Sequence, residues 1–353
     1  MQDAVHPEIA ARQRLRRYEI AGWAVAALLI LPFSVAIAVT LGPADISFGE
    51  VWSTIAGKLG LDLGMDVSLV RERIVWELRL PRALLAGCVG AGLALCGVVL
   101  QSLTRNPLAD PYLLGISSGA SVGAVLAIVI GFGGAAYELP ISAFVGALVA
   151  FACVLLLAGR SATRSTAPLI LAGVATTHLF SAVSSLITLL FADENATRGV
   201  FFWLLGSLSA ARWPEVVIAF LVLVAVVGVC LHAANALDGF AFGNDAAAAL
   251  GIRVERTRMV LFLATAALTA TLVAFSGAIG FIGLVIPHAA RLLVGSGHIR
   301  LLPACLLLGA IFTIGVDTFA RTAFAPREVA VGVITAIVGV PAFAVILYRH
   351  LNR

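Results

Sequence analysis

The chain has 353 residues, of which 61% are hydrophobic and only 12% are charged. Charged residues make up about a quarter of an ordinary soluble domain, so this chain has too few of them to cover a surface that faces water. The net charge of +4 is small, and no basic stripe interleaved with aromatic residues indicates nucleic-acid binding. The composition predicts an all-α integral membrane protein whose main surroundings are a lipid bilayer.

The first apolar run, residues 20–41, follows a basic cluster. Such a start is similar to a signal peptide, but the apolar stretch is too long and has no convincing small-residue cleavage site. We therefore expect a retained first membrane helix, preceded by a cytoplasmic N-terminal tail over residues 1–19. The basic cluster consists of Arg12, Arg14, Arg16 and Arg17.

The rest of the chain contains further apolar runs of the length that a membrane-spanning helix needs, which is about 20 residues. They predict about ten transmembrane helices in one polytopic domain, residues 20–353. The eighth run is short and abuts the seventh, so a count one lower or a re-entrant pair is an alternative. The runs lie near 20–41, 83–103, 115–132, 139–158, 169–191, 216–232, 259–279, 280–293, 301–319 and 329–348.

An even number of spans places both termini on one side of the membrane. With the N-terminus inside, the inner segments hold more of the basic residues than the outer segments do. The positive-inside rule therefore predicts that both termini are cytoplasmic.

Two connections are long enough to fold. In the outer connection, residues 42–82, Ser47 with Glu50 three residues later forms a capping-box pattern. In the inner connection, residues 233–258, Asn244 is a candidate cap for a short alanine-rich helix, Asp245 to Leu250, and Gly251 is a candidate C-terminal stop. Two capping signals indicate a folded cytoplasmic element rather than a bare linker.

Glycines crowd the central runs, and most of them suit close helix packing in lipid. Helix two leads to Asn106-Pro107, and helices seven and eight lead to Ile286-Pro287. Interrupted helices at matching places in two halves are typical of transporters, so we expect two weakly related halves.

Few polar residues in the chain are candidates for chemistry. Asp317 and Arg321 are four residues apart on one helix face, which suits a structural ion pair as well as a functional one. The histidines and the five cysteines show no metal-ligand spacing, and no GxxxxGK[ST] phosphate loop is present. The sequence therefore predicts no metal site, no bound cofactor and no catalytic residues.

Several motifs resemble the FecCD-type permeases of type II ABC importers, which carry vitamin B12, haem or ferric siderophores. The similarity runs in family order from Arg79 to the C-terminus. The motifs are RLPR (79–82), VVLQSLTRNPLADPYLLGISSGASVG (98–123), LILAGVA (169–175), FWLLGSLS (202–209), GAIGFIGLVIPHAARLL (277–293) and EVAVGVITAIVGVPAF (328–343). Ala330 stands where many members have proline, from which we expect a slightly different start of the last helix.

The resemblance implies a homodimer in the bacterial inner membrane, with the translocation pathway between the subunits. Two ATP-binding cassette ATPase subunits would bind below, and a periplasmic or lipid-anchored substrate-binding protein would dock above. The chain itself would be no enzyme, because ATP and Mg would belong to the partner ATPase.

The same resemblance suggests three sets of site residues. Docking of the binding protein would involve Arg79, Arg82 and Arg321. A cytoplasmic gate would involve Asn106, Leu108, Thr166 and Ala167, although Asn106 could instead only cap the approach to the next helix. Coupling to the ATPase would involve Phe242, Gly243, Asn244, Asp245, Leu250 and Gly251, with Phe242 and Leu250 as apolar knobs flanked by Arg253, Arg256 and Arg258.

The expected cargo is an iron complex, haem or a ferric siderophore, with cobalamin as the alternative. A secondary transporter driven by an ion gradient is an alternative from another class, but its coupling carboxylate would have to be Asp317, near the outer end of a helix. An intramembrane enzyme is a third alternative that lacks a candidate nucleophile and base.

Overall fold

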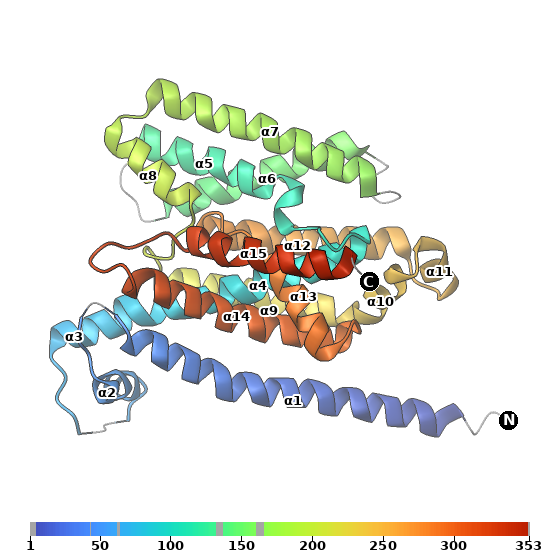
Figure 1. The fold of residues 1–353 in the computed structure, drawn as a ribbon, viewed down its shortest axis with the longest axis horizontal. Helices are drawn as coiled ribbons and strands as arrows, with labels where there is room; N and C mark the ends of the chain where they lie inside the picture. The colour runs from blue at the N-terminus through green and yellow to red at the C-terminus, as the bar shows by residue number, and fades with distance from the viewer. Residues whose placement is uncertain (1–4, 43, 62–63, 132–136, 160–165, 352–353) are drawn as a thin grey trace.

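The structure is a computed structural model that describes residues 5–42, 44–61, 64–131, 137–159 and 166–351. Every regular element in these ranges is a helix, and the long helices run side by side along one direction (Figure 1). The all-α prediction is therefore confirmed for the described residues.

Each apolar run expected from the sequence overlaps a helix. These helices are α1 (Val5–Thr40), α4 (Leu80–Thr104), α5 (Ile116–Ile130), α6 (Glu138–Ala158), α7 (Thr166–Phe191), α9 (Trp213–His232), α12 (Val254–Ser276), α13 (Ile282–Val294), α14 (His298–Thr322) and α15 (Val331–Leu351). Six helical stretches are long and apolar enough to cross a membrane, and four further apolar helices are shorter. The chain is thus a multi-pass membrane protein, while the count of ten spans stays a prediction.

Helix α4 lies at the centre of the bundle. It packs against α9, α12, α13 and α14, and an apolar surface on all sides suits a helix buried among others. Two glycines make these contacts close. A Cβ on Gly90 would lie 2.1 Å from the carbonyl oxygen of Gly309, and a Cβ on Gly97 would lie 2.1 Å from that of Gly283. Glycine is required at both positions for the backbones to approach as they do.

A break at residues 277–281 separates α12 from α13, so the seventh and eighth runs form two helices. Gly277 and Phe281 have φ angles of 67° and 69°, and the second value is unusual for an aromatic residue. Helix α13 has 13 residues, which gives a length of about 20 Å. It is therefore shorter than the hydrocarbon core of about 30 Å.

Several boundaries and elements differ from the sequence predictions. Helix α1 begins at Val5, so most of the expected tail is helical, and the second long helix begins at Leu69 instead of residue 83. It starts as α3 (Leu69–Arg73) and the π-helical stretch η1 (Ile74–Arg79), which runs straight into α4. The prediction missed this start because the charged residues of 69–79 interrupt the apolar pattern. It also missed α8 (Glu194–Leu204), α10 (Ala234–Ala241) and the 3₁₀ turn η2 (Pro111–Leu114).

The expected capping box is confirmed. Helix α2 (Phe48–Lys58) has Ser47 as its N-cap; the Ser47 side chain accepts from the backbone N–H of Glu50, and the Glu50 side chain accepts from that of Ser47. Pro107 lies in the connection after α4, whereas Pro287 lies inside α13. The two prolines therefore do not occupy matching places, and the relation between two halves stays a prediction.

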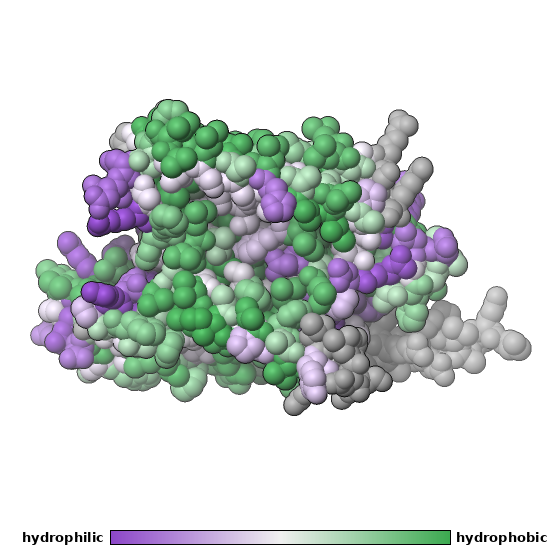
Figure 2. Space-filling view, turned by 45° about the horizontal axis from the view of Figure 1, so that its top comes forward, coloured by the Kyte–Doolittle hydropathy of each residue, from purple (hydrophilic) through white to green (hydrophobic). Residues whose placement is uncertain are grey.

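The bundle has two ends, which we name by their short helices. The α2 end carries α2, α3 and the turn between α14 and α15; the α11 end carries α10, α11 (Asn244–Ala249) and the turn between α13 and α14 (Figure 1). Hydrophobic residues cover most of the face between them, and hydrophilic residues gather mainly toward the two ends (Figure 2). Helices α1 and α15 have their outer termini at the α11 end, which the sequence assigns to the cytoplasm.

Candidate functional sites at the two ends of the bundle

The inner connection folds into two short helices at the α11 end. Helix α10 buries Leu237 and Phe240 inside the protein, and α11 buries Ala247. The chain turns between the helices at Gly243, whose φ is 104°, and leaves α11 through Gly251, whose φ is 79°. Glycine adopts both conformations without the steric penalty that a Cβ brings. Buried apolar side chains therefore hold the element against the bundle, and its glycines allow its turns.

Two large apolar side chains of this element face outward. Phe242 is 80% exposed and Leu250 is 70% exposed. They follow the last residues of α10 and α11, so each knob sits at a helix end. Their exposure agrees with the apolar knobs expected from the sequence, and their role in coupling stays a prediction.

Two details of the expected coupling element are wrong. Asn244 is the first residue of α11 instead of its cap, which is Gly243, and its side-chain oxygen accepts from Arg258 at 2.9 Å. Arg258 does not flank the knobs, because it is 1% exposed. Its guanidinium lies over the ring of Phe240 at 5.8 Å and donates to the Leu103 carbonyl at 3.3 Å. Arg253 and Arg256 are exposed as expected.

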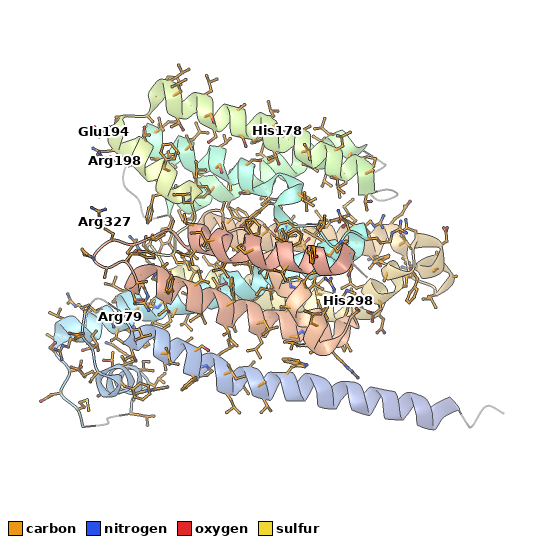
Figure 3. The ribbon with its side chains drawn as sticks, in the orientation of Figure 1. Arg79, His178, Glu194, Arg198, His298 and Arg327 are labelled. Atoms are coloured by element: carbon orange, nitrogen blue, oxygen red, sulfur yellow. The ribbon has the colours of Figure 1, made fainter. Side chains whose placement is uncertain are left out.

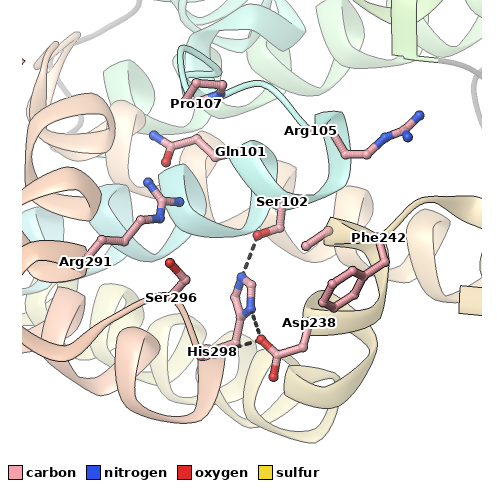
Figure 4. Close-up of a pocket in the computed structure, with 11 residues that line it drawn as sticks. Gln101, Ser102, Arg105, Pro107, Asp238, Phe242, Arg291, Ser296 and His298 are labelled. Carbon is pink, nitrogen blue, oxygen red and sulfur yellow. Dashed lines mark hydrogen bonds and ion pairs between the residues drawn. The ribbon is translucent and has the colours of Figure 1, made fainter. Parts of the chain in front are cut away.

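A chain of hydrogen bonds crosses the same end of the bundle (Figure 4). The His298 Nε2 atom lies 2.5 Å from the Ser102 hydroxyl, and its Nδ1 atom lies 2.6 Å from the Asp238 carboxylate. Asp238 also accepts from the backbone N–H of His298 at 3.0 Å. Since Ser102 is in α4, Asp238 in α10 and His298 at the start of α14, this chain joins three elements.

A cavity of about 540 Å³ opens beside this chain. Arg105 from the end of α4 and Arg291 from the last turn of α13 bring two positive charges to it, and Asp238 brings one negative charge (Figure 4). Phe242 stands at the same cavity. The α11 end therefore presents a cationic hollow next to an exposed aromatic ring.

The turn after α4 contains the first pair of expected gate residues. Arg105 closes α4 in the left-handed conformation, with φ of 51°. The side chain of Asn106 then accepts from the backbone N–H of Leu108 at 2.9 Å, which is the turn-forming geometry of asparagine before proline. Leu108 is 46% exposed, so the local turn and an exposed apolar tip are both present.

The second pair of gate residues, Thr166 and Ala167, opens helix α7. Thr166 is partly buried and Ala167 is exposed. Helix α7 begins at the α11 end, on the same side of the bundle as the turn after α4 (Figure 1). Their role as a gate stays a prediction.

The expected docking arginines lie at the α2 end, near the position that Arg79 marks in Figure 3, but they face inward. Arg79 and Arg321 are each 6% exposed. Arg79 donates to the carbonyls of Val39 and Ala44 at 2.9 and 2.6 Å, and Arg321 donates to the carbonyl of Ala38. The side chain of Arg82 is 11% exposed and binds Asp317 at 2.9 Å and Glu328 at 3.0 Å.

The burial of these arginines links them to folding as well as to docking. Charge reversal at Arg79, Arg82 and Arg321 would remove these internal bonds, so we expect it to impair folding. Asp317 is 2% exposed and lies between Arg82 and Arg321, which makes it the centre of a buried ion cluster. Its burial and its two arginine partners favour the structural interpretation of the i,i+4 pair.

The remaining polar candidates give no metal site. Within the described residues, no group of three or more histidine, cysteine, aspartate or glutamate side chains could hold a metal ion. His288 contacts the carbonyl of Leu284 at 2.7 Å, and His178 is exposed on α7 (Figure 3). Four of the cysteines are buried and the fifth, Cys153, is partly buried.

Comparison with known proteins places this geometry in a family. The model of the FecCD transport family matches residues 28–349. The chain belongs to this family. The resemblance in the sequence motifs is thereby confirmed, and the chain is a permease of the type II ABC importers, which work with ATPase and substrate-binding partners.

Curated relatives of the permease differ in cargo. The cobalamin import system permease protein of Halobacterium salinarum is 39% identical over 92% of this chain and 87% of its own. The hemin transport system permease protein of Yersinia pestis is 36% identical over 92% and 95%. The molybdate import system permease protein of Haemophilus influenzae is 34% identical over 91% and 94%.

A solved structure shows the same fold. It is described as an inward-facing conformation of a metal-chelate type ABC transporter, and it aligns with a TM-score of 0.80 at 33% identity. The alignment covers 92% of this permease and 98% of that chain. The similarity therefore extends over almost the whole permease.

Sequence reasoning missed the two polar connections at the α11 end. Ser102, Asp238 and His298 are far apart in the chain, and nothing in their spacing suggests contact. The available signal was local: Asp238 is the one charged residue in the apolar stretch Ala234–Ala241. Its side chain is 43% exposed, and it binds His298, whose own side chain is buried.

Proposed function

We propose that the permease serves an importer of metal chelates in the bacterial inner membrane and that two copies enclose the translocation pathway. The observation that carries this proposal is the folded element α10–α11, which presents Phe242 and Leu250 to solvent on a buried apolar base. A permease without a nucleotide site has to receive mechanical work through such an element. A partner ATPase, which would hold ATP and Mg, is the expected occupant of this surface.

The coupling surface comprises Phe242, Gly243, Asn244, Asp245, Leu250 and Gly251. The two glycines set the turns, and the knobs supply the apolar contact. Exposed aromatic and aliphatic anchors of this kind concentrate the binding energy of protein interfaces. Arg253 and Arg256, exposed beside them, would add electrostatic attraction to an acidic partner surface.

The metal-chelate cargo is supported by the solved structure at 33% identity, whose description names that class. Haem, ferric siderophores and cobalamin all belong to it. An iron complex, haem or a ferric siderophore, is the proposed cargo, and cobalamin is the alternative. Uptake by proteoliposomes with haem, a ferric siderophore, cobalamin and molybdate as separate substrates, each with a matching binding protein, decides among them; molybdate uptake alone would contradict the class.

The opposite end is the proposed docking surface for the substrate-binding protein. Arg82 is the arginine nearest to solvent in the buried cluster, and its partner Glu328 is 40% exposed at the side chain. A binding protein that offers a carboxylate would compete with Glu328 for Arg82. Arg79 and Arg321, which are buried, would then stabilise the backbone that forms the docking surface.

The turns at Asn106 to Leu108 and at Thr166 to Ala167 are the proposed cytoplasmic gate. Cysteines at Leu108 or Thr166 would crosslink between two subunits in one nucleotide state and fail to crosslink in another. Equal crosslinking in every state would contradict a gate.

The coupling surface has a direct test. The double variant Phe242→Asp/Leu250→Asp replaces both exposed knobs with charges, so the partner ATPase should no longer copurify while the permease still inserts. The matched control is Leu59→Asp/Leu61→Asp. These leucines, near the C-terminal end of α2, are 71% and 63% exposed at the opposite end of the bundle. The control should retain the ATPase.

Copurification of the ATPase with the Phe242→Asp/Leu250→Asp variant at the wild-type level, together with normal transport, would overturn the proposal. Loss of the ATPase from the control as well would indicate a general defect in folding. The two variants therefore separate a specific surface from a damaged protein.

A further inference from the structure

The α10–α11 element is bonded to one short stretch of α4. Asp238 of α10 binds His298, and His298 binds the hydroxyl of Ser102 in α4. His298 is 4% exposed, whereas the side chain of Asp238 is 43% exposed, so the imidazole is shielded from water and the carboxylate is reached by water on one side. The first connection therefore ends on the side chain of Ser102, in the last turn of α4.

A second connection ends on the next residue. Arg258, at the start of α12, donates to the carbonyl of Leu103 and to the side chain of Asn244, the first residue of α11. Its guanidinium also lies over Phe240 of α10. A buried, delocalised cation that touches both short helices holds them to the end of α4.

The stretch that receives both connections leads directly into the proposed gate. The backbone N–H groups of Arg105 and Asn106 donate to the carbonyls of Ser102 and Gln101 at 3.3 and 3.1 Å. The turn that carries Leu108 is thus hydrogen-bonded to the last turn of α4. A displacement of this last turn has to move the gate turn with it.

Helix α10 packs on α4 through its buried side, and a cavity of about 540 Å³ opens beside this contact. Ala241 and Phe242 line the cavity together with Arg105 and Pro107 at the end of α4. Side-chain bonds therefore supplement the apolar packing where the cavity interrupts it. Discrete bonded links of this kind can carry energetic coupling between two sites.

We propose that His298 and Arg258 are positioning residues that transmit a displacement of α10–α11 to the last turn of α4 and so to the turn at Asn106 to Leu108. This inference rests on the proposed function, because it needs an ATPase that moves the loop. Ser102 and Asp238 complete the His298 connection, and Asn244 and Phe240 complete the Arg258 connection.

The test measures the number of cargo molecules transported per ATP hydrolysed, in proteoliposomes that hold the whole complex. The variants are Ser102→Ala, which deletes one hydroxyl, Arg258→Met, which keeps the length of the side chain, and the two combined. The matched control is Thr104→Ala. The Thr104 hydroxyl lies in the same turn but bonds to Leu100 within its own helix.

Each single variant should bind the ATPase and hydrolyse ATP, while cargo transported per ATP falls. Coupling networks of this kind contribute enough for a fall of about 2- to 30-fold, and the double variant should lie at the upper end. Thr104→Ala should keep the wild-type ratio. A purely structural role would lower the unfolding temperature and the amount of assembled complex without changing this ratio.

An unchanged ratio in the double variant would overturn the inference. If that variant does not assemble, the ratio in Ser102→Ala, which removes a single oxygen atom, decides in the same way. Failure of the proposed function is a different result: the wild-type permease itself would then neither retain an ATPase nor transport.

Discussion

The two ends of the bundle use arginine in opposite ways. At the α2 end, Arg79 and Arg321 are 6% exposed and bonded inside the fold. At the α11 end, Arg253 and Arg256 are exposed beside two apolar knobs. The sequence presents both groups alike, as arginines next to apolar runs. The difference teaches that the available acceptors, more than the residue type, decide whether an arginine is structural or free for a partner.

The acceptors at the α2 end come from a helix terminus. The last carbonyls of α1 have no partner within the helix, and Arg79 and Arg321 donate to those of Val39 and Ala38. A positive charge is also favourable at a helix C-terminus, where the backbone dipoles leave partial negative charge. The two arginines therefore cap the C-terminal end of α1 and hold it against the neighbouring helices.

The largest expected effect is at the α2 end. Asp317→Ala removes the carboxylate between Arg82 and Arg321 and leaves two buried cations without it. Breaking a buried ion pair by removing one partner costs about 3 to 5 kcal/mol, so the variant should unfold at a much lower temperature. Thermal unfolding in detergent measures the change.

Glu328→Gln is the matched control for this experiment. Glu328 binds the same Arg82, but its side chain is 40% exposed, and ion pairs at the surface contribute about 1 kcal/mol or less. If the unfolding temperature fell equally in the two variants, burial would not be what distinguishes the two carboxylates.

The next effect is at the α11 end and concerns binding instead of stability. Phe242→Ala truncates a ring that is 80% exposed, so the unfolding temperature of the isolated permease should stay the same. Truncation of an interface anchor costs about 2 kcal/mol, which corresponds to about a 30-fold weaker association with the ATPase. A binding titration with purified ATPase gives the value, and an unchanged Kd would remove Phe242 from the interface.

The sequence predicted most of the fold because lipid imposes a simple rule. Apolar runs become helices, since no water is present to satisfy the backbone, and all expected runs overlap helices. It failed where polar and apolar residues alternate, as in the start of the helix at Leu69 and in α10. Packing against neighbouring helices decides the outcome in such segments.

The sequence predicted which segments carry the candidate sites, but it predicted few of the side-chain contacts within them. Phe242 and Leu250 are exposed as expected, because a short connection with few polar side chains leaves some apolar side chains exposed. Arg258 binds Leu103, 155 positions away along the chain, and His298 binds Ser102, 196 positions away. Such long-range pairs leave no periodic signal in a single sequence.

A smaller effect at the α11 end concerns charge alone. Arg253→Gln/Arg256→Gln removes two exposed charges without touching the knobs. Charges at an interface rim steer the approach of a partner more than they hold the complex, so association with the ATPase should slow while dissociation changes little. The difference from wild type should shrink as salt is added, because about 0.15 M salt screens exposed charges beyond roughly 8 Å. A faster dissociation that is insensitive to salt would place these arginines inside the contact.

The smallest effect returns to the α2 end and depends on pH. The backbone N–H of Ser47, followed by the side chain of Arg71, holds the pKa of Glu50 below its ordinary value. A lowered pKa in the folded state stabilises the protein above the ordinary value of about 4.3, and this contribution is lost as the pH falls through the folded pKa. The protection of the α2 amide hydrogens against exchange, measured relative to an unfolded chain at the same pH, should therefore fall below about pH 4. Because Glu50 is partly buried at the protein surface and α2 has only 11 residues, the change should be small and local. The control is Glu50→Gln, which has no charge to lose in this pH range. If the difference in amide protection between wild type and variant stays constant from pH 6 to about pH 3, the capping box does not depend on the ionised carboxylate.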